Sequence, residues 1–103
     1  MISRHWKGTC KRDQAEAYVR HMQSETLPAL QAIPGFVRAS ILRRDVPSGI
    51  EFQIVTAWQS LDAIRAFAGE DAEAAVVPAA VQAMMVDFER RAVHYEVAAS
   101  TGE

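Results

Sequence analysis

The chain has 103 residues, half of them hydrophobic and 23% charged, which is typical of one folded globular domain rather than a disordered segment. A formal net charge of −2 with scattered basic residues excludes the strongly basic surface by which proteins bind nucleic acid. The sequence has neither an apolar N-terminal run nor a long apolar stretch, so we expect no signal peptide and no membrane span.

Cysteine and histidine usage argues against a metal site. Cys10 is the only cysteine, so neither an intrachain disulfide nor a thiolate cluster can form. No H-x-x-x-H spacing, clustered acidic pattern or phosphate-binding glycine loop is present. We therefore expect a cytoplasmic protein that holds no metal and no cofactor.

The first third of the chain predicts a strand followed by a helix. Residues 2–9 alternate between two faces, as a half-buried strand does. Asp13 and Glu16 have the spacing of a capping box, so a helix is expected to begin there. Apolar residues then recur at intervals of three and four. Pro28 is expected to kink this helix, and Pro34-Gly35 to end it.

The middle of the chain predicts a β-hairpin. Residues 36–46 and 50–58 are rich in β-branched and aromatic side chains. They flank Pro47-Ser48-Gly49, a sequence typical of a turn.

The last third predicts a second helix, two short helical pieces and a closing strand. Ser60 is a suitable N-cap for a helix over residues 61–68. Residues 70–89 are helix-prone, but Pro78 interrupts them, so two short helices are expected there. Residues 89–98 alternate again and predict the last strand.

The order β-α-β-β-α-β is typical of the ferredoxin-like α+β fold, a four-stranded antiparallel sheet with helices on one face. We expect one domain over residues 1–98 and a frayed tail over 99–103. The strand at 50–58 is mostly apolar on both faces, so the face without helices is expected to pack against a second copy, giving a homodimer.

Three motifs resemble those of the antibiotic biosynthesis monooxygenase (ABM) domain, a branch of the dimeric α/β-barrel superfamily. They are R-x-W-x-G at 4–8, W-x-S-L-x-A-I-R-A-F at 58–67 and H-Y-E-V at 94–97. The resemblance covers nearly the whole chain. It implies a barrel made of two sheets and a pocket between the sheet and helices of each subunit. Members include cofactor-free oxygenases of phenols and quinols, haem-degrading oxygenases and domains without demonstrated activity.

The resemblance implies a cofactor-independent monooxygenase that acts on a small aromatic substrate of the quinol or anthrone kind. Such a substrate reduces dioxygen once it is deprotonated, so the protein needs an apolar pocket, a base and a donor for the anion. We expect His94 to be the base and Arg4 to stabilise the anion. The aromatic residues expected to bind the substrate are Trp6, Phe36, Phe52, Trp58 and Phe67.

A purely structural interpretation competes with this one. If Arg4 lies opposite Glu96, then Trp6 falls opposite His94, and these pairs satisfy one another without chemistry. The aromatic residues would then be core, and the chain a non-catalytic ligand-binding or structural dimer. Haem degradation is disfavoured, because residues 60–93 contain no histidine for the haem iron.

Overall fold

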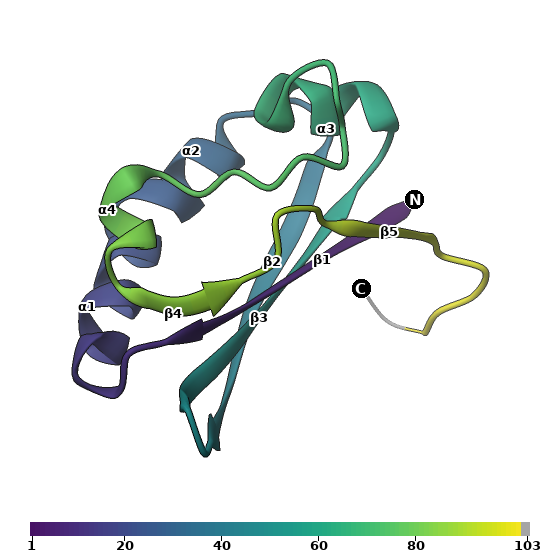
Figure 1. The fold of residues 1–103 in the computed structure, drawn as a ribbon. Coiled ribbons are helices and arrows are strands. Elements are labelled where there is room, and N and C mark those ends of the chain that lie inside the picture. Colours follow the sequence, from purple (N-terminus) through teal and green to yellow (C-terminus); the bar gives the residue numbers. More distant parts are fainter. Residues whose placement is uncertain (102–103) are drawn as a thin grey trace.

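Five alternating or β-branched segments form one antiparallel sheet in the computed structural model, which describes residues 1–101 (Figure 1). The order β2-β3-β1-β4, with β5 also beside β1, is that of the predicted ferredoxin-like fold, which is thereby confirmed. The sheet is not closed within the chain. The strands are β1 (Ile2–Cys10), β2 (Phe36–Val46), β3 (Gly49–Trp58), β4 (Met85–Phe88) and β5 (Val93–Glu96).

The helices lie on one face of this sheet (Figure 1). No helix within residues 1–101 combines the length and apolar character needed to cross a membrane. The tail predicted at 99–103 forms no helix or strand up to residue 101, and its last two residues lie outside the described part. The helical elements are η1 (Arg12–Gln14), α1 (Ala15–His21), η2 (Met22–Thr26), α2 (Leu27–Gln31), α3 (Leu61–Ala68) and α4 (Ala79–Gln82).

The first helical segment runs from η1 to α2 and tolerates its proline through a wider turn. Pro28 has no N–H to donate and its ring crowds the preceding turn. The chain accommodates this with η2, a π-helical turn in which Leu27 N–H donates to the carbonyl of Met22. The predicted capping box does not form: Lys11 is the N-cap residue, no side chain caps the helix, and Asp13 lies inside the first turn.

The second helix begins and ends as predicted. The Ser60 hydroxyl accepts a hydrogen bond from Ala63 N–H at 3.1 Å, which satisfies one of the unpaired donors of the first turn. Gly69 ends α3 with a φ of +92°, a backbone conformation that only glycine adopts without strain.

The expectation for residues 70–98 was wrong in two respects. Only Ala79–Gln82 is helical, and the sheet gains β4 before β5. Residues 70–78, which we call the strap, are not helical but partly extended. Val76 and Val77 are β-branched and precede Pro78, which disfavours helical backbone at the residue before it. β4 and β5 together pair one edge of β1, so the backbone groups of that edge are satisfied.

The core consists of two aromatic clusters on the helical side of the sheet. In one, Tyr18 of α1 packs edge-to-face on Phe52 of β3, with ring centroids 4.7 Å apart. In the other, Trp58 packs between Phe36 and Phe67, at 5.3 and 6.0 Å. Arg4, Trp6 and Thr56 lie on the same side of the sheet as these clusters, because alternate residues of a strand share a face.

The packing of α3 predicts a large difference between two of its apolar residues. Ile64 is fully buried, whereas Leu61 is 41% exposed. We expect Ile64→Ala to lower the free energy of unfolding by about 2–5 kcal/mol and Leu61→Ala by about 0.5 kcal/mol. Urea unfolding followed by circular dichroism measures both. Equal losses would show that α3 does not pack as described.

Candidate functional site

A small cavity lies between the sheet, the first helical segment and the strap. Its volume is about 60 Å³, room for a few water molecules. Most of its lining is apolar, from Met22 and Leu30 on the helical side to Val76 and Val77 on the strap. Its polar lining residues are Arg4, Tyr18, Thr26 and Thr56.

Arg4 is the only charged residue among those that line the cavity, and its side chain is held by backbone rather than by acid. It is 5% exposed. Its Nη1 donates to the carbonyl of Ala72, and its Nη2 donates to the carbonyl of Ala74 at 2.7 Å. The ring of Phe67 lies 5.8 Å from the guanidinium carbon. Burial lowers the pKa of Arg4 and nearby Glu73 opposes this, but arginine stays charged.

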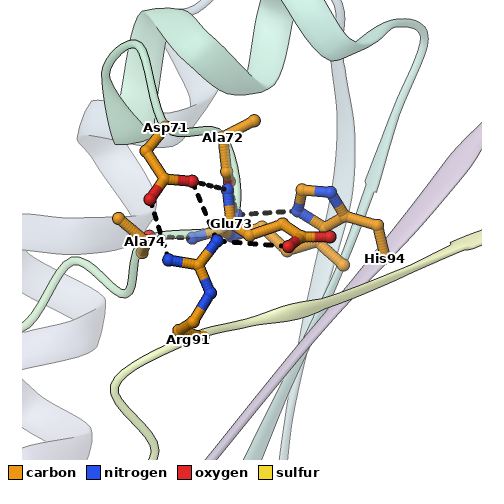
Figure 2. A network of polar contacts seen from close by, with 7 residues as sticks. Asp71, Ala72, Glu73, Ala74, Arg91 and His94 are labelled. Carbon is orange, nitrogen blue, oxygen red and sulfur yellow. Dashed lines mark hydrogen bonds and ion pairs between the residues drawn. The ribbon is translucent and has the colours of Figure 1, made fainter.

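The strap is fastened from its outer side by a second arginine (Figure 2). Arg91 Nη1 lies 2.8 Å from Asp71 Oδ2, and its Nη2 lies 3.2 Å from Glu73 Oε1. Backbone bonds add to this: Ala92 N–H donates to the Glu73 carbonyl at 2.8 Å. The hydrogen bond from Arg91 lowers the pKa of Asp71. The strap, whose Ala72 and Ala74 carbonyls accept from Arg4, is therefore held by Arg4 on one side and by Arg91 and Ala92 on the other.

His94 meets Arg4 across the pair of strands β1 and β5, in a register that differs from the predicted one. Arg4 lies opposite His94, and Ile2 lies opposite Glu96. The predicted pairs Arg4–Glu96 and Trp6–His94 are therefore wrong by two residues. The strap is the physical cause: Ala74 pairs with Arg91, and β5 can pair with β1 only after that bridge.

The contact between Arg4 and His94 fixes the protonation of the imidazole. Arg4 Nη1 lies 2.8 Å from His94 Nε2. Because a guanidinium can only donate, Nε2 must accept, and the proton of the neutral ring belongs on Nδ1. Burial lowers the pKa of His94, the positive charge of Arg4 lowers it further, and Glu73 opposes both.

The structure brings three of the seven predicted site residues to the cavity: Arg4, Trp6 and Phe67. Trp6 Nε1 donates to the carbonyl of Glu89 at 2.7 Å, so its ring is held in place. His94 does not line the cavity and reaches it only through Arg4. The other predicted residues, Phe36, Phe52 and Trp58, pack in the two core clusters and do not line the cavity.

Three residues with hydroxyl groups line the cavity but were not among the predicted site residues: Tyr18, Thr26 and Thr56. Burial raises the pKa of Tyr18, so its phenol is neutral and can donate. Thr56 Oγ1 accepts from Trp58 Nε1 at 2.8 Å, which leaves the threonine O–H free to donate. Thr26 lies on the helical side. A signal existed in the sequence: Tyr18, Met22, Thr26 and Leu30 recur every four residues and so share one helix face.

Comparison with known proteins places the fold. No protein-family model and no curated protein matches the sequence. Solved structures match over nearly the whole chain. One from Bacillus cereus, named as an antibiotic biosynthesis monooxygenase, is 18% identical with a TM-score of 0.68, and the match covers 100% of this chain and 96% of that one. The fold is that of the ABM-type proteins.

Two further structures with the ABM-type fold differ in what they do. SnoaB from Streptomyces nogalater, a cofactor-independent oxygenase, is 17% identical with a TM-score of 0.67, covering 99% of this chain and 97% of that one. MhuD from Mycobacterium tuberculosis, a heme-degrader with two hemes bound in its active site, is 19% identical with a TM-score of 0.61, covering 99% and 100%. Within residues 1–101 of this chain, no three histidine, cysteine or acidic side chains gather to hold a metal ion.

The lowered pKa of His94 predicts a loss of stability in acid. Its pKa in the folded chain is below its ordinary value, so the unfolded chain takes up the proton first as the pH falls. The stabilising contribution is complete above pH of about 6.5 and is lost below it. We expect the free energy of unfolding to fall less between pH 7.5 and 5 in His94→Gln than in the wild type, as measured by urea unfolding. Equal falls would contradict the assigned environment of His94.

Proposed function

We propose that the chain is a cofactor-independent oxygenase that binds a small aromatic hydroxylated substrate in the cavity, with the ionised oxygen of the substrate against Arg4. The observation that carries this proposal is a buried guanidinium in an apolar cavity without an acidic partner among the described residues. A buried charge of this kind favours an anionic ligand. The resemblance in fold to SnoaB, a cofactor-independent oxygenase, supports the proposal.

Arg4 keeps donors available for such a ligand. A guanidinium has five N–H groups. Ala72 and His94 take both of those on Nη1, and Ala74 takes one on Nη2. The Nε–H and one Nη2–H have no partner within residues 1–101. No buried side-chain nitrogen in this part of the chain lacks a partner, so Nε must be reachable from the space beside it.

The chemistry follows from the charge of Arg4. An opposite charge lowers the pKa of a bound phenol or enol, so the substrate is held as its anion. Its electron-rich ring then reacts with dioxygen directly. One oxygen atom replaces two hydrogens at a substrate methylene carbon and becomes a carbonyl oxygen, and the other leaves as water with those two hydrogens. The substrate supplies all four electrons.

The strap must move for this substrate to enter. A volume of about 60 Å³ is far below the roughly 300 Å³ at which ligand pockets begin. Val76, Val77 and Pro78 form one wall of the cavity, and Val76 is 43% exposed. Outward movement of this end of the strap would enlarge the cavity and separate Val77 from the core cluster of Tyr18 and Phe52, against which it packs.

A second candidate function is binding without turnover. Among the described residues that line the cavity there is no histidine and no carboxylate, so no lining group is an evident base. A ligand could therefore bind against Arg4 and remain unchanged. Ligand binding without oxygen uptake would favour this candidate. Haem degradation is less well supported, because no histidine stands among the described residues that line the cavity.

The role of Arg4 is tested by oxygen consumption with a panel of small anthrone-like phenols, which carry the methylene carbon that the proposed step oxidises. Arg4→Gln removes the charge that stabilises the anion, and we expect the rate above the uncatalysed reaction to fall about 100-fold or more. Arg65→Gln is the matched control, since Arg65 is an exposed arginine paired with Asp62 on α3. Circular dichroism establishes that both variants are folded. A fully active Arg4→Gln variant would contradict the proposal.

We also propose that the sheet face opposite the helices packs against a second copy of the chain. Leu42 of β2 is 52% exposed and Tyr95 of β5 is 55% exposed on that face. Large apolar side chains on a sheet face are typical of an interface.

Sedimentation velocity tests the dimer. We expect the wild type to sediment as a dimer at micromolar concentration, and Leu42→Glu combined with Tyr95→Glu to sediment as a monomer, because charge at the centre of an apolar interface is costly. Leu61→Glu, at an exposed residue of α3, serves as the control and should remain dimeric. A monomeric wild type would refute the interface.

A further inference from the structure

We infer that His94 is a positioning residue, which orients Arg4 toward the cavity through its neutral imidazole and does not itself take a proton from the substrate. The inference rests on the proposed function in one respect only: Arg4 is taken as the group that contacts the bound anion. The contact between the two side chains stands independently of any substrate.

Hydrogen bonds hold the guanidinium of Arg4 at its two Nη atoms. Nη1 donates to the carbonyl of Ala72 and to His94 Nε2, so neither of its hydrogens remains. Nη2 donates to Ala74, and the ring of Phe67 lies over the guanidinium. Rotation of the guanidinium would break all three hydrogen bonds together. The donors left over, Nε–H and one Nη2–H, are therefore presented in a fixed direction, as bidentate anion recognition requires.

His94 cannot serve Arg4 and act as a base at the same time. The one nitrogen of a neutral imidazole that can accept a proton is Nε2 here, and it is occupied by the bond from Arg4. The other nitrogen, Nδ1, carries the proton. His94 also does not line the cavity. A base role would require the contact between Arg4 and His94 to break in every turnover.

The charges around His94 favour its neutral form, in which Nε2 can accept the hydrogen bond from Arg4. Arg4 from β1 disfavours the imidazolium, and burial acts in the same direction. Glu73 from the strap favours the imidazolium. The amino-terminal residue Met1 and Glu96 of β5 border the same shallow surface hollow as His94. The hydrogen bond adds to this balance, because an imidazolium has no acceptor to offer to Arg4.

Substitution at His94 separates the two roles. His94→Gln places a carbonyl acceptor near the position of Nε2 but cannot act as a base, whereas His94→Leu offers no acceptor. The probe is benzenesulfonate, which stays anionic at all working pH values, titrated by NMR. We expect affinity within about 3-fold of the wild type for His94→Gln and at least about 10-fold weaker for His94→Leu, as for the loss of a hydrogen bond to a charged group. His5→Leu, on the opposite sheet face, is the control and should bind as the wild type does.

Two further readouts make the outcome decisive. Oxygen uptake should survive in His94→Gln, and its loss in that variant while benzenesulfonate still binds would make His94 the base and overturn the inference. ¹⁵N NMR of the histidine rings needs no ligand: we expect His94 as the Nδ1–H tautomer at pH 7, and a rise of its pKa toward the ordinary value in Arg4→Gln. An Nε2–H tautomer would also overturn the inference. Absence of oxygen uptake in the wild type, with the expected tautomer present, would count against the proposed function alone.

Discussion

A guanidinium removed from water needs acceptors, and in this chain the acceptors of Arg4 come from the peptide backbone. Two carbonyls of the strap and the imidazole of His94 take three of its N–H groups. No carboxylate within the described residues forms an ion pair with Arg4, and the nearby charge of Glu73 offsets only part of the desolvation cost. This one side chain joins β1, the strap and β5, which are far apart in the sequence, and it directs the remaining charge toward the cavity.

The position of the strap follows from the same interaction. Residues 71–74 of the strap form a turn, in which Ala74 N–H donates to the Asp71 carbonyl at 3.0 Å, and the carbonyls of Ala72 and Ala74 both accept hydrogen bonds from Arg4. The side chains of Asp71 and Glu73 reach Arg91 instead (Figure 2). The ion pairs with Arg91 are half exposed and stabilise little by themselves. The hydrogen bonds to Arg4 and the backbone bonds to residues 90–92 together hold the strap, so the same segment supplies a wall of the cavity and the acceptors of its charged residue.

Cofactor-independent oxygenation and haem degradation occur on the same ABM-type fold, as SnoaB and MhuD illustrate. The fold therefore does not distinguish these two activities, and the distinction depends on the residues that line the cavity. In this chain the lining combines apolar side chains, one arginine and hydroxyl groups of Tyr18, Thr26 and Thr56. Such a set suits a small molecule that carries one negative charge and a few polar oxygens more closely than it suits a porphyrin.

The sequence by itself determined the elements whose signals are local. The turn after Val46 and the N-cap at Ser60 specify the hairpin and α3, and alternation places Arg4 and Trp6 on one face of β1. Alternation has a period of two, however, so a shift of the last strand by two residues leaves the pattern unchanged. Local signals therefore cannot choose between Glu96 and His94 as the neighbour of Arg4. The tertiary structure decided it through the strap, whose pairing with Arg91 sets where β5 begins. It also decided that Trp58 is core and not cavity, because burial depends on neighbours that the sequence does not reveal.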